Sequence, residues 1–174
     1  SKDVTSSIVL IDKENGGHGS TINAGLKVAK GKYFRVLDAD DRLSSEALGR
    51  HLEFLATTNS DIVFTNTIHD LSIPSKLVDD KKYEFMIPHK EYEFDSLCEE
   101  NYGFPGYGVV LSTSSVKTEK LKKSGCELPE KCFYDDIVMN YYMTKASDTA
   151  VLDPVSLYYY YLGRSGQSLS KASY

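Results

Sequence analysis

The chain has 174 residues, of which 41% are hydrophobic and 26% charged, so it can form one globular domain and is not an intrinsically disordered chain. Its net charge of −5 argues against nucleic acid as a partner, because phosphate backbones attract clustered Lys and Arg. No apolar run reaches the length of about 18 residues that a membrane-spanning helix requires.

Apolar periodicity predicts a strand, a helix and a second strand in the first part of the chain. Residues 8–11 form a short apolar run that is typical of a buried strand. Ser20 or Thr21 is a typical N-cap, and Gly31 a typical C-terminal stop, for a helix between them. The apolar face of this helix would consist of Ile22, Leu26 and Ala29. Residues 33–37 then predict a second strand, mostly apolar and therefore buried on both faces.

A second helix and a third strand follow. Ser44 is the expected N-cap of the helix, and residues 61–67 (DIVFTNT) are typical of a strand. One side of this helix would carry Leu48, Leu52 and Leu55. Strands that alternate with helices favour a parallel sheet. The predicted fold class is therefore α/β, a Rossmann-like α/β/α sandwich with a mostly parallel sheet.

The middle of the chain has a weaker pattern. Residues 70–100 mix charged and apolar side chains without a clear period, which predicts a long irregular excursion that can include short strands. Residues 109–111 predict a short strand. Ser114 or Ser115 is the expected start of a helix that ends near Gly125.

The last part of the chain predicts a helix, strands and a polar tail. Asp135 is the expected cap of a helix that runs to about Lys145. Residues 149–163 predict two short strands around Pro154, and the polar tail after them predicts a loop. The four tyrosines at 158–161 are typical of a strand with alternating faces, with a sugar-stacking surface as the alternative. The three cysteines form no CxxC pair, which favours reduced thiols and a cytoplasmic protein.

Three carboxylates, Asp38, Asp40 and Asp41, follow the second predicted strand directly. Two acids at the end of a buried strand repel each other unless a cation neutralises them, so Asp38 and Asp40 predict a Mg²⁺ or Mn²⁺ site completed by phosphate oxygens. For Asp41, capping of the following helix is the favoured interpretation. The glycine of an EF-hand loop is absent, which argues against a calcium site of that kind.

A glycine-rich turn precedes the first predicted helix, at residues 15–19 (NGGHG). Its backbone amides can approach a ligand closely, and the helix behind it favours anions. A plain turn between a strand and a helix is the alternative. The short separation between this turn and Asp38 favours the functional interpretation.

Residues 12–43 (DKENGGHGSTINAGLKVAKGKYFRVLDADDRL) resemble a segment of the family 2 glycosyltransferases, which have the GT-A fold. In that family N-G-G precedes an Asn-x-Gly helix, and A-x-G-K-Y leads into D-x-D-D. The positions that match are Asn23, Gly25, Ala29, Gly31, Asp38 and Asp40. Ile22 stands where many relatives carry Arg, which places the chain nearer a bacterial branch. Residues 132–140 (CFYDDIVMN) and 158–170 (YYYYLGRSGQSLS) are similar to the family's acceptor-side acidic motif and its Y-x-h-G-R-x-x-Q-S segment.

This resemblance implies an inverting, metal-dependent transfer of a sugar from a nucleoside-diphosphate sugar, most often a UDP-sugar, to an acceptor hydroxyl. The pathway would be bacterial cell-surface polysaccharide or glycoconjugate synthesis, with a saccharide, lipid-linked or protein acceptor. Asp38 and Asp40 would hold Mn²⁺ or Mg²⁺. Asp136 would be the general base and Asp135 the helix cap, or the two roles would be exchanged. The substrate-binding residues would be Asn15, Gly16, Gly17, His18, Asn23, Asp38, Arg164, Gln167 and Ser168.

The family's first two strands, with their P-x-Y-N and D-G-S-x-D segments, do not occur here, so we expect a chain that begins inside a larger domain. Within one partial domain, residues 1–69 would be the nucleotide-sugar and metal half, and residues 70–174 the acceptor-side half. The expected location is the cytoplasm, with the inner face of the membrane as an alternative for the full-length protein. A non-catalytic carbohydrate-binding or scaffold domain of the same fold, and a metal-dependent phosphohydrolase, remain as alternatives.

Overall fold

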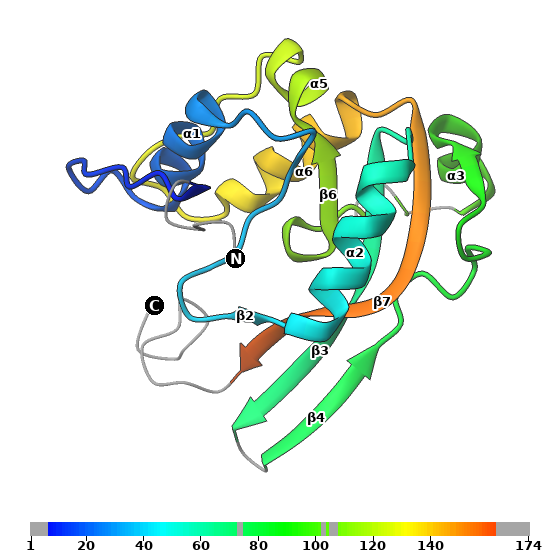
Figure 1. Ribbon diagram of the computed structural model, residues 1–174. Coiled ribbons are helices and arrows are strands. Elements are labelled where there is room, and N and C mark those ends of the chain that lie inside the picture. Colours follow the sequence, from blue (N-terminus) through cyan, green and yellow to red (C-terminus); the bar gives the residue numbers. More distant parts are fainter. Residues whose placement is uncertain (1–6, 73–74, 102–103, 105–107, 163–174) are drawn as a thin grey trace.

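The computed structural model describes residues 7–72, 75–101, 104 and 108–162, which form a seven-stranded sheet flanked by helices (Figure 1). The strands are β1 (Tyr33–Phe34), β2 (Arg42–Leu43), β3 (Ile62–Ser72), β4 (Ser75–Asp80), β5 (Glu91–Glu93), β6 (Ser114–Lys117) and β7 (Thr149–Leu162). The helices are α1 (His18–Val28), α2 (Ser45–Thr57), α3 (Phe94–Glu100), α5 (Thr118–Lys123) and α6 (Asp135–Lys145), with a 3₁₀ turn η2 (Leu111–Thr113). No described helix combines the length and the hydrophobicity needed to cross a membrane.

The sheet is mixed, which confirms the α/β class but corrects the prediction of a mostly parallel sheet. Its order is β1-β6-β3-β7-β2, with β4 paired to β3 and β5 paired to β7. Among the described strands only β3 and β7 pair in parallel; β6 is antiparallel to both of its neighbours, β1 and β3. The alternation of strand and helix patterns could not predict this, because β6 enters the sheet after a long excursion rather than through a crossover helix.

Strand β3 lies at the centre of the core. One face of the sheet packs against α1, α5 and α6, and each large apolar side chain fully buried there contributes roughly 1.5–3 kcal/mol. The buried side chains on that side include Ile62, Phe64, Val116 and Leu152 from the sheet, and Ile22, Leu26, Leu121, Met139 and Met143 from the helices. Helix α2 lies across the other face, in front of β3 and β7 in Figure 1, where His51 reaches Ser115 and Asp153.

Two predicted strands are shorter than expected or missing. Residues 8–11 form no strand, and Leu10 is 90% exposed, because no described strand lies beside them to pair with. Of residues 33–37 only Tyr33 and Phe34 pair, and Leu37 is 47% exposed. Strand β1 is at the end of the sheet order and pairs with β6 alone among the described strands, so burial on both faces was the wrong expectation.

Helices α1 and α2 differ from prediction at their ends and faces. The N-cap of α1 is Gly17, not Ser20 or Thr21, and the helix ends at Val28, ahead of Gly31. Its buried face, Ile22 and Leu26, is as predicted, and Ala29 is half-buried. For α2 the cap prediction is confirmed, since Ser44 Oγ accepts a hydrogen bond from the Ala47 amide. On its predicted leucine side, Leu52 is 56% exposed and Leu48 and Leu55 are half-buried, whereas the buried residues of α2 are Ala47 and His51.

The remaining predictions had mixed outcomes. Residues 114–117 are strand β6 rather than the start of a helix, and α5 begins only at Thr118, although it does end close to Gly125. Residues 109–111 form no strand. The range of α6 is confirmed. Residues 70–100 include the end of β3, the β3–β4 hairpin, β5 and α3, so this segment is more regular than predicted.

Strand β7 is one continuous strand rather than two. Its pairing with β3 shifts register between Phe64 and Thr67, and Pro154 lies in this irregular part. Proline has no amide hydrogen to donate to a sheet, so it is tolerated at such a bulge. The Asn66 side chain donates to the Pro154 carbonyl at 3.2 Å. β3 lies mostly in the first predicted half of the domain, residues 1–69, and β7 lies in the second, residues 70–174. The two strands are nevertheless neighbours in a single sheet.

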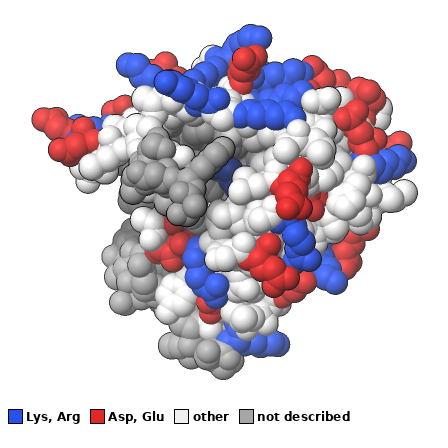
Figure 2. All heavy atoms as spheres, in the orientation of Figure 1, with Lys and Arg blue, Asp and Glu red and all other residues white. Residues whose placement is uncertain are grey.

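The surface is charged but mixed. Figure 2 shows acidic and basic side chains interspersed over the face that it draws, with Lys and Arg gathered along the top, over α1 and α5. In α5 the basic residues are Lys120, Lys122 and Lys123. Over the rest of this face the two signs alternate (Figure 2).

Candidate functional site

His18, the first residue of α1, joins two acidic segments that are far apart in the sequence. Its Nδ1 lies 3.0 Å from Asp135 Oδ2, and its Nε2 lies 3.0 Å from Asp38 Oδ1. The side chains of His18 and Asp38 are 41% and 33% exposed, whereas that of Asp135 is 7% exposed. The glycine turn (residues 15–19), the carboxylate turn (residues 38–41) and the start of α6 therefore meet at one place. The sequence analysis had expected the first two to lie close together.

The electrostatics of this contact favour a charged imidazole. The hydrogen bond to Asp38 and the charges of both carboxylates outweigh burial and raise the pKa of His18 to about 9. At neutral pH both ring nitrogens then carry protons and donate, one to each acid. His18 is consequently a cationic link between the segment of Asp38 and the segment of Asp135.

The carboxylate turn is held by its last acid. Asp41 accepts hydrogen bonds from the Tyr158 hydroxyl at 2.6 Å and from the Tyr161 amide at 2.8 Å. The Asp38 amide donates to the Tyr158 hydroxyl oxygen at 3.3 Å. Burial raises the pKa of Asp41. Asp41 therefore fastens the turn to β7 and is not the helix cap we had predicted, a role that Ser44 fills.

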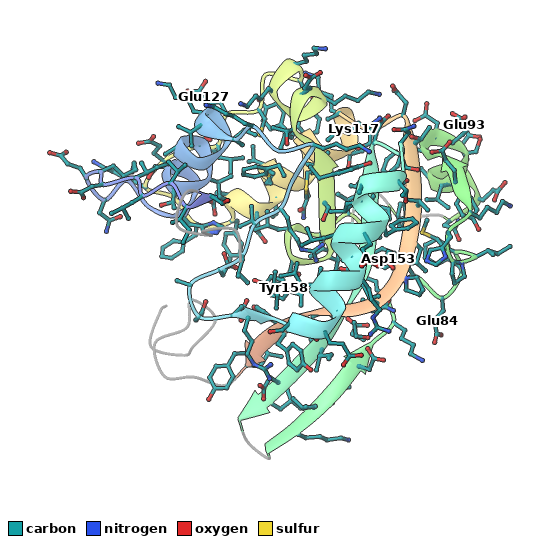
Figure 3. All side chains as sticks on the ribbon, in the orientation of Figure 1. Glu84, Glu93, Lys117, Glu127, Asp153 and Tyr158 are labelled. Atoms are coloured by element: carbon teal, nitrogen blue, oxygen red, sulfur yellow. The ribbon has the colours of Figure 1, made fainter. Side chains whose placement is uncertain are left out.

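The tyrosines of β7 face this turn. Tyr158 is buried and lies between α2 and the loop that leads to the carboxylates (Figure 3). Tyr160, two residues on, is half-buried. Burial raises its pKa, and so do nearby negative charges. Those charges belong to Asp41, Asp38, Asp40 and Asp136. The acids of the carboxylate turn and Asp136 therefore both lie near enough to Tyr160 for their charges to act on it.

The residues present suit a hard divalent cation bound together with a phosphorylated ligand. Asp38 and Asp40 are half-buried and lie on one short turn, and carboxylate oxygens are preferred ligands of Mg²⁺ and Mn²⁺. Within the part of the chain that the structure describes, no three His, Cys, Asp or Glu side chains gather to hold a metal by themselves. Phosphate oxygens and water would have to complete the coordination.

The glycine turn owes its shape to close contacts. Gly17 has a φ of +86°, which favours glycine, and its amide donates to Asn15 Oδ1 at 2.9 Å. A Cβ on Gly19 would meet the Pro129 carbonyl oxygen and would lie 2.9 Å from Asp135 Oδ2. The absence of side chains here lets α1 approach the segment before α6, which brings His18 to Asp135.

Asn23 holds α1 against the segment before α6. Its side-chain amide donates to the Leu128 carbonyl at 2.9 Å and accepts from the Leu128 amide at 2.9 Å. Both halves of the amide are thereby used to clamp α1 to the segment before α6. The structure gives Asn23 this positioning contact, and the substrate contact that we expected for it stays a prediction.

The two acids at the start of α6 have different surroundings. Asp135 is buried and bonded to His18, whereas Asp136 is exposed. The N-cap of α6 is Tyr134, in a left-handed conformation with φ 64°, and no side chain caps the helix. Asp135 is therefore not the helix cap. Arg164, Gln167 and Ser168, which we predicted as substrate-binding, lie outside the described residues.

A buried polar network beneath the site escaped the sequence reasoning. Arg35 donates to Ser115 Oγ at 3.0 Å, and Ser115 Oγ lies 3.1 Å from His51 Nε2. His51 Nδ1 in turn lies 2.7 Å from Asp153 Oδ2 (Asp153 is labelled in Figure 3). Burial lowers the pKa of Arg35 to about 10. The available signal was a charged residue within an otherwise apolar strand, YFRVL.

Comparison with known proteins adds the family and related structures. The family model described as Glycosyl transferase family 2 matches residues 4–118. A poly(ribitol-phosphate) beta-glucosyltransferase of Bacillus spizizenii is 28% identical, over 67% of this chain and 22% of that protein.

The fold is similar to that of S. aureus TarS. The structure of TarS residues 1–349 in complex with UDP-GlcNAc has a TM-score of 0.70 at 19% identity, covering 96% of this chain and 48% of that one. The complex with UDP has a TM-score of 0.65 at 19% identity, covering 85% and 41%. This chain thus spans less than half the length of each of these relatives.

Proposed function

Because the chain belongs to glycosyl transferase family 2, we propose that it carries the donor-binding and base-bearing part of an enzyme that transfers a sugar from a UDP-sugar to a hydroxyl of a polyol-phosphate cell-wall polymer. The observation that carries the proposal is the contact of His18 with both Asp38 and Asp135, which assembles the carboxylate turn and the start of α6. The polymer is suggested by the poly(ribitol-phosphate) relative, and the UDP-sugar by TarS in complex with UDP-GlcNAc.

The donor would bind between the glycine turn and the carboxylate turn. The N-terminal end of α1 carries partial positive charge and free backbone amides, which favour a diphosphate. Asp38 and Asp40 would hold Mg²⁺ or Mn²⁺, and that ion, when bound, would offset the negative charge of the leaving UDP. Asp41 keeps the turn in place through Tyr158 and Tyr161 and does not need to contact the donor.

Asp136 is the better candidate for the general base. It is exposed, so an acceptor hydroxyl can reach it, whereas Asp135 is buried and already bonded to His18. In an inverting transfer the acceptor oxygen attacks the anomeric carbon and the bond from that carbon to the UDP oxygen breaks. Asp136 accepts the hydroxyl proton as the new bond forms. A positioned base of this kind typically contributes roughly 10²–10⁴-fold to the rate.

His18 would act as a positioning residue in this scheme. It holds the acid that precedes the base on α6 and at the same time the first acid of the carboxylate turn. A shift of one segment would therefore be transmitted to the other. Since reacting groups must be placed within a fraction of an ångström, this link supports an arrangement in which donor and acceptor meet.

The test uses the full-length protein and the variant Asp40→Asn. We expect UDP to bind in the presence of Mn²⁺, measured by calorimetry, and the variant to lose most of that metal-dependent affinity because one anionic ligand is gone. Unchanged affinity in the variant would refute the metal assignment.

Incubation with UDP-glucose and UDP-GlcNAc should release UDP and transfer or free the sugar. Release of phosphate from a phosphomonoester without sugar release would favour the phosphohydrolase alternative, and UDP-sugar binding without any turnover the non-catalytic one.

A further inference from the structure

A second group of polar and aromatic side chains lies beside the candidate site, on three neighbouring strands. Tyr160 on β7 is the register partner of His69 on β3, and their ring centroids are 6.1 Å apart. His69 Nε2 lies 3.7 Å from Asp80 Oδ2 on β4. We call Tyr160, His69 and Asp80 the hairpin row. It runs from β7 across β3 to the outer strand of the β3–β4 hairpin, which Figure 1 shows projecting away from the body of the molecule.

The hairpin row is continuous with the carboxylate site. Tyr158 and Tyr160 are alternate residues of one strand, and Tyr158 donates to Asp41. The charges of Asp38, Asp40, Asp41 and Asp136 also act on Tyr160. At the other end of the row, the side chains of His69 and Asp80 are 35% and 42% exposed, so a ligand can reach them. The row thus begins at the carboxylates and ends in solvent.

We propose that the hairpin row is an extended binding surface for the acceptor, holding hydroxylated units next to the one that receives the sugar. An aromatic ring offers a face for C–H groups, and an imidazole and a carboxylate offer a donor and acceptors for hydroxyls. Neighbouring strands are about 4.8 Å apart, so the row from β7 to β4 spans roughly 10 Å. That span is compatible with more than one unit of a polyol or sugar chain.

The assignment rests on the proposed function for the identity of the site, but it makes a separate claim about acceptor length. A single-unit acceptor would contact the carboxylate site alone. A longer chain would also contact His69 and Asp80 and would bind more tightly. The hairpin row should therefore determine how affinity depends on chain length, and should leave donor binding unchanged.

The experiment measures equilibrium binding of ribitol-phosphate oligomers with one, four and eight units, and of neutral gluco-oligosaccharides of matched length, to the full-length protein. We expect affinity to rise with length for at least one series. His69→Ala combined with Asp80→Asn should reduce the affinity for the longest oligomer about fivefold or more, the effect of roughly one lost hydrogen bond, and should leave single-unit binding unchanged. The series that responds identifies whether polyol phosphate or neutral sugar is the ligand.

Asp79→Asn is the matched control. Asp79 neighbours Asp80 on β4, but successive residues of a strand point to opposite faces, and Asp79 accepts a hydrogen bond from Ser156 Oγ at 2.7 Å. The inference is overturned if affinity does not rise with length, if the double variant keeps the length dependence, or if Asp79→Asn lowers it equally. UDP calorimetry on the same samples separates this from a failure of the proposed function: a protein that binds UDP but no oligomer refutes the hairpin row alone.

Discussion

His18 contacts two carboxylates, Asp38 and Asp135, that are far apart in the sequence, and its surroundings explain why this contact is stable. A neutral imidazole has one N–H and could donate to only one of the two acids, whereas the protonated ring donates to both. The neighbouring acids in turn raise its pKa, so protonation and the double contact support each other. The positive charge of His18 thereby offsets the repulsion between the two negatively charged segments that it joins.

The charge of His18 should make stability depend on pH. Its pKa is raised from 6.5 to about 9 in the folded protein, so the folded state binds the proton more tightly than the unfolded chain. This contribution is complete below pH 6.5 and is lost as the pH rises through about 9. We expect the free energy of unfolding, measured with urea, to fall more steeply between pH 6.5 and about pH 9 in the wild type than in His18→Gln. Solvent screening will limit the size of the difference, since the side chain is 41% exposed.

Two observations would contradict this expectation. The first is a pair of parallel pH profiles for the wild type and His18→Gln. The second is an NMR titration of the His18 ring with a midpoint near 6.5. Either result would show that His18 is not a cationic link between Asp38 and Asp135. Neither would contradict the fold.

The two acids of α6 should respond differently to the same substitution. Asp136→Asn keeps the size of the side chain but cannot accept a proton at neutral pH, so we expect kcat to fall about 100-fold or more with UDP affinity unchanged. Asp135→Asn should have a milder effect on kcat, because Asp135 contacts His18 rather than an acceptor. Steady-state kinetics of both variants in the full-length protein decide between them. If Asp135→Asn is the more severe, the roles are exchanged; if neither lowers kcat, neither is the base.

At the scale of elements, α1 is placed by contacts that lie outside the helix itself. Asn23 clamps it to Leu128, and Gly16 accepts a hydrogen bond from the Lys131 amide at 2.8 Å. These contacts fix the distance between the start of α1 and the start of α6. The helix therefore brings His18 to Asp135 because of the segment before α6, not because of its own length or cap.

Replacement of Asn23 by Leu tests this clamp. Leucine has a similar volume but leaves the Leu128 amide and carbonyl without their partner, which costs about 1–3 kcal/mol for an unsatisfied buried group. We expect urea denaturation to register a loss of that size. Thr21→Val is the control on the same helix, since Thr21 is exposed and makes only a 3.3 Å contact with the Gly17 carbonyl. Equal losses in the two variants would mean that Asn23 contributes no more than a surface position does.

Elements with a local signal were predictable, and those that depend on distant partners were not. The cap Ser44 and the apolar run of β3 could be read from the local sequence. The range of α6 was also predicted, although its expected cap, Asp135, does not cap it. Residues 114–117 look like a helix start because two serines precede an apolar residue. They form a strand because β1 and β3 lie on either side of them. No local pattern contains that information.

The candidate site was predictable to a similar extent. The motif residues Asp38, His18 and Asp135 do come together. His18 and Asp135 are the first residues of α1 and α6, and Asp38 lies in the connection between β1 and β2. Asp41 was predicted as a helix cap, and the positioning role of Asn23 was not foreseen, since their partners, Tyr158 and Leu128, are more than 100 positions away. The sequence indicates which residues are polar at a turn, but not which of them are already satisfied by the fold.

For the whole molecule, the site depends on the simultaneous placement of three segments: residues 15–19, 38–41 and 134–137. A ligand that contacts the first two should also restrain the third, because His18 connects them. Binding to the native state lowers the population of locally opened forms. We therefore expect UDP with Mn²⁺ to slow amide hydrogen exchange in all three segments of the full-length protein, and to leave residues 75–80 of the β3–β4 hairpin unchanged. His18→Gln should retain protection at the first two segments and lose it at 134–137. Protection of the third segment in that variant, or protection spread evenly through the hairpin as well, would show that His18 is not the connection.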